Sequence, residues 1–345
     1  MPQPKLRLAL FGSGRIGQVH ASSIAAHPDI DLVVIADPFI DGARELADRT
    51  GARAVEDPAE VFAINDLDGV VIASPTPTHV DLMSRAAAHG LAVLCEKPID
   101  LDIYTVLECR ERISSCSVPI MLGFNRRFDP HFASIRTQVE AGSIGALEQL
   151  LITSRDPAPA PKDYIAASGG IFRDMTIHDL DMARFFIPEI VEVSAVGANV
   201  FSDDIRELND FDSATITLRG SNGELVTIVN SRHCAFGYDQ RLEAFGTDGM
   251  LSAGNVTKTL VRRYDASGTE EAPPYLPFFL ERYAQAYRAE LDAFAHSIRT
   301  GDPCSPSFED GVAALVLANA AAESATTGKT VAITATAAPL RSRVS

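Results

Sequence analysis

An acidic side chain and a histidine stand four positions apart, at Asp174 and His178, in a segment with helical spacing. Residues at this spacing share one face of a helix. A carboxylate beside an imidazole orients the ring and stabilises its protonated form, so the pair could take a proton from a hydroxyl group. The alternative interpretation is a surface pair with no chemical role.

A lysine could assist such a proton transfer. Lys97 follows the apolar run Ala92–Cys95, which is typical of a strand buried in a parallel sheet, and it precedes Pro98. At the carboxyl end of that strand, a lysine could donate a hydrogen bond to an alcohol oxygen and stabilise developing negative charge. Taken alone, Lys97 could equally be a solvated surface residue.

A glycine-rich segment predicts a dinucleotide site. The sequence G-S-G-R-I-G at 12–17 follows the apolar run Leu6–Phe11 and opens the predicted helix Arg15–His27. An acidic residue, Asp37, closes the next apolar run about 20 residues later, the offset typical of a dinucleotide-binding unit. A glycine turn without a ligand is the alternative.

The residue types within this segment each suit a bound dinucleotide. Gly12 would permit a tight turn, Gly14 would let the backbone approach a pyrophosphate, and Gly17 would let the helix lie close to the strand. Asp37 could accept hydrogen bonds from both ribose hydroxyls and would repel a 2′-phosphate. Pro38 stands where an arginine could otherwise bind that phosphate, so the sequence favours NAD over NADP.

A turn that ends the apolar run Gly69–Ala73 is a further candidate, because ligands of open parallel sheets lie beyond the carboxyl ends of the strands. Ser74 and Thr76 would then lie near the nicotinamide ribose, with a simple turn as the alternative. A structural role is the alternative for His79, and a solvated side chain for Arg15. The predicted cofactor-binding residues are Gly12, Gly14, Arg15, Ile16, Gly17, Asp37, Ser74, Thr76, His79, Glu96 and Lys97.

The order of these patterns predicts an α/β protein with two domains. Strand and helix patterns alternate through residues 1–124, which predicts a Rossmann domain with a doubly wound parallel sheet. Longer strand patterns joined by turn signals such as Ser221–Gly223 occupy 125–330, so a largely antiparallel sheet is expected there. Residues 331–345 read as a loose C-terminal tail.

Composition excludes several classes of protein. The 345 residues include 30 Lys and Arg against 46 Asp and Glu, a net charge of −16 that disfavours nucleic acid and anionic membranes as partners. No apolar stretch has the length of a membrane span, and no cleavable signal peptide is evident. Five scattered cysteines and the lack of a cysteine–histidine cluster favour a reducing cytoplasmic setting and no metal site.

Several motifs together resemble the glucose–fructose oxidoreductase/inositol dehydrogenase family, also written Gfo/Idh/MocA, to about residue 330. The motifs occupy 12–17, 74–79, 96–98 (EKP), 123–129 (GFNRRFD), 154–157 (SRDP), 169–184 (GGIFRDMTIHDLDMAR) and 237–246. The resemblance implies a Rossmann domain, followed by an α/β domain whose large, open, mostly antiparallel sheet commonly mediates homotetramers.

The resemblance also implies an activity and its residues. The catalytic trio corresponds to Lys97, Asp174 and His178, and the implied substrate contacts are these three together with Asn125, Arg127, Asp156 and Tyr238. The implied reaction is NAD-dependent oxidation of myo-inositol to 2-keto-myo-inositol in inositol catabolism, with His178 as general base. A dehydrogenase for another inositol isomer or sugar, and a non-catalytic NAD-binding regulator, remain alternatives.

Overall fold

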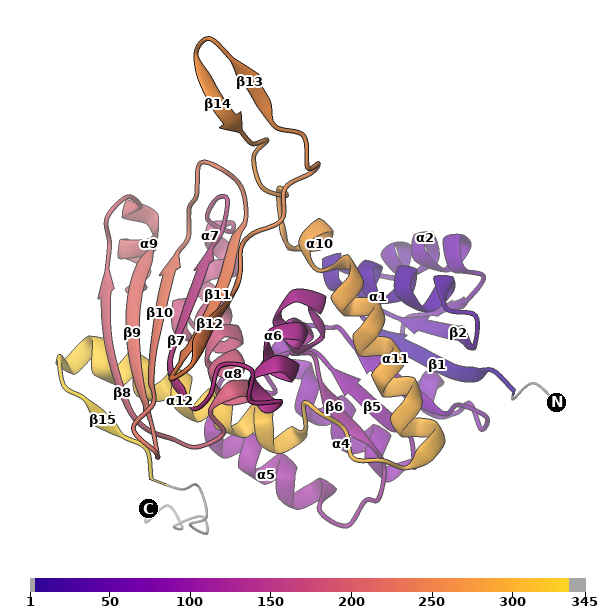
Figure 1. Ribbon diagram of the computed structural model, residues 1–345. Coiled ribbons are helices and arrows are strands. Elements are labelled where there is room, and N and C mark those ends of the chain that lie inside the picture. Colours follow the sequence, from indigo (N-terminus) through magenta and orange to yellow (C-terminus); the bar gives the residue numbers. More distant parts are fainter. Residues whose placement is uncertain (1–3, 335–345) are drawn as a thin grey trace. The chain divides into compact units, whose positions relative to one another are not determined.

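The computed structural model describes residues 4–334, which divide into two compact units (Figure 1). Unit 1 contains the described residues up to Ser134 and the segment Val256–Leu315, whereas unit 2 contains Ile135–Asn255 and the described residues from Val316 onward. This division differs from the two contiguous segments expected from the sequence, because Val256–Leu315 returns to unit 1. Of the expected tail, residues from 335 onward lie outside the described chain.

Unit 1 is built on a six-stranded sheet in which all paired strands are parallel. Its order is β3-β2-β1-β4-β5-β6, so the order of strands reverses between β1 and β4, where ligands of such sheets bind. The strands are β1 (Leu6–Phe11), β2 (Ile30–Ala36), β3 (Arg53–Val55), β4 (Gly69–Ile72), β5 (Ala92–Cys95) and β6 (Ile120–Leu122).

Helices of unit 1 come from both of its segments. Helix α11 packs against α1, and it adds Leu291 and Phe294 to the core that contains Leu8, Leu10 and Ile24 (Figure 1). The helices are α1 (Arg15–Ala26), α2 (Ile40–Thr50), α3 (Ala59–Phe62), η1 (Thr76–Thr78), α4 (His79–Ala88), α5 (Ile103–Ile113), η2 (Asn125–Phe128), α10 (Phe279–Arg282) and α11 (Ala284–Thr300). A two-stranded hairpin, β13 (Arg263–Asp265) with β14 (Gly268–Glu271), precedes α10.

Unit 2 contains a seven-stranded sheet in the order β12-β11-β7-β10-β9-β8-β15. Every pair is antiparallel except β7 with β10. Alternate residues of β9 are buried, as expected when one face of a sheet covers a core. The strands are β7 (Leu147–Arg155), β8 (Ile190–Ala198), β9 (Ser213–Gly220), β10 (Leu225–Ser231), β11 (Asp239–Gly246), β12 (Gly249–Ala253) and β15 (Val331–Ala332).

The helices of unit 2 include one local irregularity. Where the sequence predicts a continuous helix over Ser168–Phe186, a π-helical turn, η3 (Phe172–Thr176), precedes α8 (Ile177–Phe186). Such turns are rare and often occur at functional sites. The other helices are α7 (Lys162–Ala167) and α9 (Asp203–Glu207), while α6 (Pro130–Glu140) and α12 (Phe308–Thr327) contribute residues to both units.

These two sheets confirm the predicted α/β class, with a doubly wound parallel domain first and a mostly antiparallel sheet second. None of the helices described between residues 4 and 334 has both the length and the apolar character needed to cross a membrane.

Candidate functional site

The glycine loop between β1 and α1 is closely packed at its two ends and open in the middle. Gly12 has φ +97°, and a Cβ atom there would lie 2.6 Å from the carbonyl oxygen of Ala73. A Cβ on Gly17 would lie 2.1 Å from the oxygen of Gly12, whereas one on Gly14 would meet nothing within 4 Å. The loop therefore tolerates no side chain at its ends and leaves space beside its centre.

The N-terminus of α1 suits an anion. Its N-cap residue, Gly14, provides no side-chain cap, and its first turn contains no acidic residue, so no side chain of the helix itself neutralises the positive end of its dipole. Arg15 is exposed in the first turn, and its guanidinium carbon lies 6.0 Å from the centre of the Phe278 ring. The space beside Gly14, the uncapped amides and this cation fit a pyrophosphate group.

Asp37 is held against the same loop. It follows β2, and its Oδ2 accepts hydrogen bonds from the backbone nitrogen and hydroxyl of Ser13, at 2.7 and 2.8 Å. Its Oδ1 accepts a third hydrogen bond, from the nitrogen of Phe39 at 2.8 Å. A carboxylate has further lone pairs, so Asp37 can still accept hydrogen bonds from ribose hydroxyls. Ser13, a variable position of the motif, was not among the predicted residues.

His79 connects two turns that carry other predicted residues. Its buried ring places Nδ1 2.8 Å from the oxygen of Pro98 and Nε2 2.8 Å from the oxygen of Ser74. Burial lowers the pKa of His79, although both carbonyl contacts oppose this change. The ring thereby links the turn after β4 to the turn after β5, which supports the structural alternative for its side chain. The Ser74 hydroxyl lies 2.5 Å from that of Thr78, and Thr76 is half-buried in η1.

Lys97 and Glu96 follow β5 directly and differ in their surroundings. Lys97 is half-buried and joined to Pro98 by a cis peptide bond, whereas the carboxylate of Glu96 is buried 2.9 Å from Nε2 of His20 in α1. The structure thus places Lys97 at the carboxyl end of a parallel strand, as the sequence predicted.

The predicted substrate residues Asn125 and Arg127 lie in η2, and both are buried. A guanidinium nitrogen of Arg127 lies 3.0 Å from Oδ1 of Asp310. Burial alone would raise the pKa of Asp310, but Arg127 and hydrogen bonds from Ser307 outweigh burial and hold that pKa below its ordinary value. Asp310, which the sequence analysis missed, therefore neutralises charge on Arg127.

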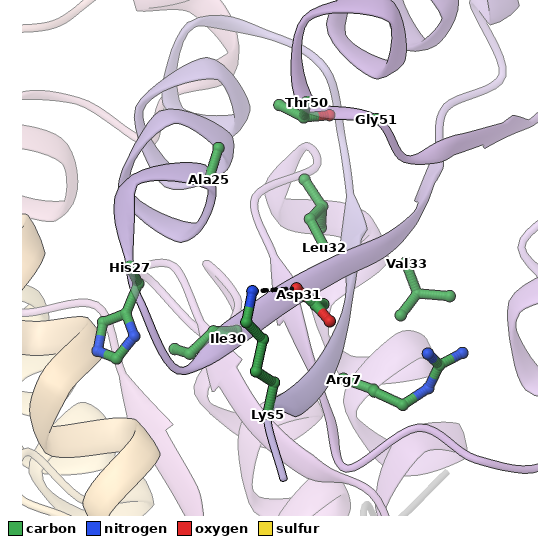
Figure 2. A pocket seen from close by; sticks show the side chains of 10 residues that line it. All are labelled: Lys5, Arg7, Ala25, His27, Ile30, Asp31, Leu32, Val33, Thr50 and Gly51. Carbon is green, nitrogen blue, oxygen red and sulfur yellow. Dashed lines mark hydrogen bonds and ion pairs between the residues drawn. The ribbon is translucent and has the colours of Figure 1, made fainter. Parts of the chain in front are cut away.

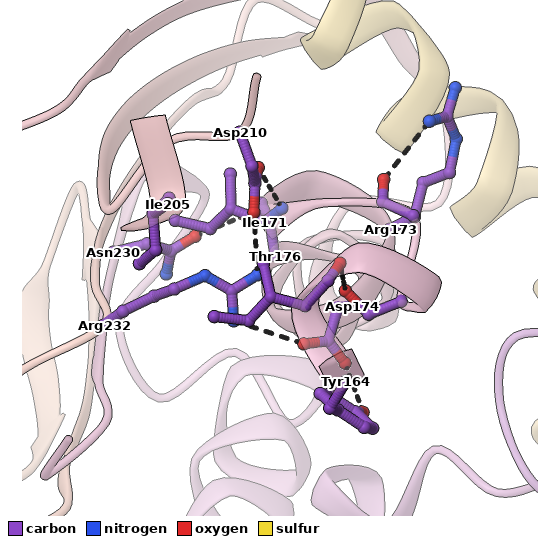
Figure 3. A network of polar contacts seen from close by, with 12 residues as sticks. Tyr164, Ile171, Arg173, Asp174, Thr176, Ile205, Asp210, Asn230 and Arg232 are labelled. Carbon is purple, nitrogen blue, oxygen red and sulfur yellow. Dashed lines mark hydrogen bonds and ion pairs between the residues drawn. The ribbon is translucent and has the colours of Figure 1, made fainter. Parts of the chain in front are cut away.

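In unit 2, Asp174 is held by two groups that the sequence analysis also missed (Figure 3). The hydroxyl of Tyr164 donates to its Oδ1 at 2.9 Å, and Nη1 of Arg232 lies 3.3 Å from its Oδ2. The other terminal nitrogen of Arg232 lies 3.2 Å from Asp210, whose Oδ1 accepts from the nitrogen of Ile171 at 2.8 Å. A buried cation thus bridges two carboxylates at the start of the helical segment that leads to His178.

A second polar network fixes α8 on the sheet. Asp179, one residue after His178, accepts hydrogen bonds from Ser154 of β7 at 2.6 Å and from Asn230 of β10 at 2.8 Å. Thr176 donates to the same asparagine at 2.6 Å. All of these side chains except His178, which is half-buried, are buried. The network therefore fixes the residues on both sides of the predicted base.

Strand register gathers the remaining residues of unit 2 at one end of its sheet. Arg155 of β7 pairs with Ser231 of the parallel strand β10, so Asp156 and Arg232 follow at the same edge. Arg155 also pairs with Asp239, the first residue of the antiparallel strand β11, and Tyr238 immediately precedes it. Since Arg232 contacts Asp174, unit 2 brings Asp156, Tyr238 and Asp174 toward one edge.

The predicted residues therefore fall into two sets. Lys97, Asn125, Arg127 and the cofactor-binding residues belong to unit 1, and Asp156, Asp174, His178 and Tyr238 belong to unit 2. No group of three or more histidine, cysteine or carboxylate side chains suited to a metal ion occurs among residues 4–334.

A hollow of about 380 Å³ lies elsewhere in unit 1 (Figure 2). It is lined by the first residues of β1 and β2 and the last turns of α1 and α2, and it includes an ion pair of 2.9 Å between Lys5 and Asp31. The glycine loop follows the carboxyl end of β1, so this hollow is separate from the predicted cofactor site.

Comparison with known proteins shows the family of the chain. Residues 6–123 match the model of an oxidoreductase family with an NAD-binding Rossmann fold, and residues 132–252 match the GFO/IDH/MocA C-terminal domain. The inositol 2-dehydrogenase of Rhizobium meliloti (strain 1021) is 43 % identical over 95 % of this chain and 99 % of its own length.

Solved structures give the same result. A myo-inositol dehydrogenase from Corynebacterium glutamicum ATCC 13032 superposes with a TM-score of 0.94 at 65 % identity, covering 96 % of this chain and 99 % of that one. A scyllo-inositol dehydrogenase from Lactobacillus casei, with bound NAD(H) and scyllo-inositol, has a TM-score of 0.87 at 29 % identity, over 95 % and 99 % of the two chains. The chain, with its NAD-binding Rossmann domain, belongs to the GFO/IDH/MocA family of oxidoreductases.

Proposed function

We propose that this protein is an NAD-dependent inositol 2-dehydrogenase that oxidises myo-inositol to 2-keto-myo-inositol in inositol catabolism. The observation that carries the proposal is the polar edge of unit 2, where Asp174 is bonded to Tyr164 and Arg232 one helical turn before His178. The similarity to a myo-inositol dehydrogenase at 65 % identity supports the choice of substrate. Oxidation of scyllo-inositol is the second candidate, because the Lactobacillus casei relative was solved with that isomer.

Each residue of the trio has a defined task in this proposal. NAD, when bound, accepts the hydride from the carbon that is oxidised. His178 removes the proton of the hydroxyl on that carbon, and Lys97 donates a hydrogen bond to the same oxygen as its charge grows. Asp174 orients His178 and stabilises its protonated form. Lys97 belongs to unit 1 and the other two residues belong to unit 2.

The cofactor is assigned to the groups around the glycine loop. The backbone of 12–17 and the N-terminus of α1 would bind the pyrophosphate, and Asp37 would accept hydrogen bonds from the adenosine ribose. Asp37 is close enough to bond the loop at Ser13, so a 2′-phosphate beside it would meet its negative charge. This repulsion favours NAD over NADP.

An uncharged polyol suits the proposed substrate contacts. Inositol presents hydroxyls that both donate and accept, so its site needs both kinds of group. Asn125 and Tyr238 can do both, whereas Asp156 accepts and Arg127 donates. The ion pair of Arg127 with Asp310 offsets its charge, which favours a neutral substrate over an anionic one.

The first test is NADH absorbance with purified protein, NAD and myo-inositol, with scyllo-inositol and glucose in parallel. Turnover with myo-inositol and loss of at least about 100-fold in kcat for His178→Ala would support the assignment, since a positioned base contributes about 10²–10⁴-fold. Retention of NADH affinity by the variant separates loss of the base from loss of the fold. Full turnover by His178→Ala would show that His178 is not the general base. If the wild-type protein binds NADH tightly but turns over none of the polyols, it is better explained as a regulator.

We also propose that the protein is a cytoplasmic homotetramer. The outer face of the unit 2 sheet carries exposed apolar side chains at Leu151, Leu225, Phe245 and Met250, which a second copy could cover. Light scattering coupled to size-exclusion chromatography tests the stoichiometry, and a monomer at micromolar concentration would contradict it.

A further inference from the structure

Unit 1 encloses three titratable side chains that the proposed reaction does not use. His20 comes from α1, Glu96 from the turn after β5, and Glu290 from α11. Their exposed fractions are 1 %, 8 % and 0 %. The ring of Tyr287, one turn before Glu290 on the same helix, meets the ring of His20 edge-on at 5.6 Å. Three segments that are far apart in the sequence therefore bring ionisable groups together in one interior.

Two members of this cluster form a bonded pair. Nε2 of His20 lies 2.9 Å from Oε1 of Glu96. The Glu96 side chain lies against Gly123, where an added Cβ would come within 3.0 Å of its carboxyl carbon. His20 belongs to the helix that begins at the glycine loop, and Glu96 immediately precedes Lys97. The pair thus ties the cofactor-side helix to the turn that carries the predicted catalytic lysine.

Glu290 is the unusual member. Both of its carboxyl oxygens are buried, and neither makes a hydrogen bond within the described part of the chain. Burial, and then the negative charge of Glu96, raise the pKa of Glu290 well above its ordinary value. With Glu290 neutral, the cluster holds at most one anion, Glu96, and one cation, His20. Ionised Glu290 would add a second buried anion that has no partner.

Two arginines lie on elements that pack against α11. Helix η2 packs on α11, and the guanidinium of its Arg126 lies 5.7 Å from the ring centre of Tyr283. Arg282, from α10, lies 4.8 Å from the same ring and forms an ion pair with Asp129. The titratable and charged groups on the elements around Glu290 therefore include His20, Glu96, Tyr287 and these two arginines.

We propose that Glu290 is a positioning residue through its charge: while it is neutral, the His20–Glu96 pair and the turn of Lys97 stay in place, and its ionisation at alkaline pH displaces them. Loss of that proton places two carboxylates of like charge in a region of low dielectric, which pushes Glu96 away from His20. The part of the proposal that concerns catalysis rests on the proposed role of Lys97. A purely structural side chain at this position would change the Tm with pH but would leave NADH binding and turnover of the folded protein unchanged.

The decisive variant is Glu290→Gln, which keeps the size and neutrality of the acid and removes its proton equilibrium. Glu281→Gln is the matched control, because it removes an exposed carboxylate of the adjacent helix α10. A carboxyl group that is protonated in the folded protein and ionised in the unfolded protein lowers the folding equilibrium constant by about tenfold per pH unit above its ordinary pKa. We therefore expect the Tm of wild type to fall behind that of Glu290→Gln as pH rises above about 5. The Glu281→Gln curve should follow wild type.

Cofactor binding and turnover supply the second readout. At pH 6.5, the NADH affinity and the kcat of Glu290→Gln should lie within about twofold of the wild-type values. As pH rises and Glu290 ionises in the folded protein, wild type alone should lose both NADH binding and turnover. The Tm and NADH measurements need no polyol, so they test Glu290 even if inositol proves not to be the substrate. Superimposable Tm–pH curves, or an alkaline loss that persists in Glu290→Gln, would overturn the proposal.

A spectroscopic measurement covers the case in which the variant does not fold. Infrared spectra of wild type labelled with ¹³C-carboxyl glutamate should show the C=O stretch of a protonated acid at pH values where glutamates with an ordinary pKa of about 4.3 are ionised. Absence of that band at those pH values would also overturn the proposal.

Discussion

Replacing Arg232 with methionine tests how Asp174 is held in place. Methionine keeps much of the length of the arginine side chain and removes its charge and its hydrogen bonds. In the wild-type protein, Arg232 is 1 % exposed and lies 3.3 Å from Asp174 and 3.2 Å from Asp210. The substitution therefore leaves two largely buried carboxylates without the cation that bridges them.

The expected loss follows from burial. Removing one partner of a buried ion pair lowers the free energy of unfolding by about 3–5 kcal/mol. The lower limit applies here because the side chain of Asp174 is 14 % exposed. A loss of about 3 kcal/mol lowers the Tm of a domain of this size by about 6–12 °C. Misplacement of Asp174 should also lower kcat by about 100-fold, as expected for a shift near 1 Å in a catalytic group.

Differential scanning calorimetry and NADH absorbance measure the two effects. Arg219→Met is the matched control, since Arg219 pairs with Glu192 at 3.3 Å while the two side chains are 57 % and 40 % exposed. An exposed pair of this kind contributes about 0–1 kcal/mol, so the control should melt close to wild type. Arg232→Lys keeps the charge but not the fork that reaches both carboxylates, and should fall between the two. If Arg232→Met melts and turns over like Arg219→Met, the reasoning is refuted.

Three other predictions concern unit 1. Gly17→Ala should abolish NADH binding in a fluorescence titration, because the added Cβ would lie 2.1 Å from a backbone oxygen. Gly14→Ala should keep the wild-type Tm while weakening NADH binding, because its added Cβ would meet nothing within 4 Å. Equal NADH affinities of the two variants would contradict the packing argument. Asp37→Ala should lower the ratio of turnover with NAD to turnover with NADP by about tenfold, as expected when about 1.4 kcal/mol of repulsion is removed. An unchanged ratio would show that another residue discriminates between the two cofactors. Because the pKa of Asp310 is lowered, its contribution to stability is complete above its ordinary value and is lost as pH falls through the folded value. Asp310→Asn should therefore lower the Tm at pH 7 and flatten its decrease between pH 5 and 3, and a parallel shift at all pH values would contradict this.

Features that depend on local chemistry could be predicted from the sequence. The strand before the glycine loop, the turn at Gly12 and the acidic residue after β2 are each encoded within a few neighbouring residues. The position of Lys97 at a strand end was also predicted correctly, because turn residues define it. Asp174 lies in the helical region expected from periodicity, but in a π-helical turn rather than in a continuous helix.

Features that depend on long-range packing could not be predicted in this way. Arg232 reaches Asp174 across 58 positions of sequence, and the contact depends on the parallel register of β10 with β7. Nothing near Arg232 in the sequence distinguishes it from a surface arginine. The return of α11 to the core of unit 1 is similarly hidden, because its apolar spacing shows that it is amphipathic but not which sheet it covers.

The division of unit 1 into two segments has a consequence for its synthesis. Helix α11 supplies Leu291 and Phe294 to a core whose other members lie mainly in the first third of the chain. A ribosome that has just added Ser134 has still to add Ile135–Asn255 of unit 2 and then the last segment of unit 1, which ends at Leu315. At about 5–20 residues per second, this interval lasts about 9–36 s. The α1 face that receives α11 stays uncovered during that time, so the nascent chain should be a better substrate for chaperones than the finished protein.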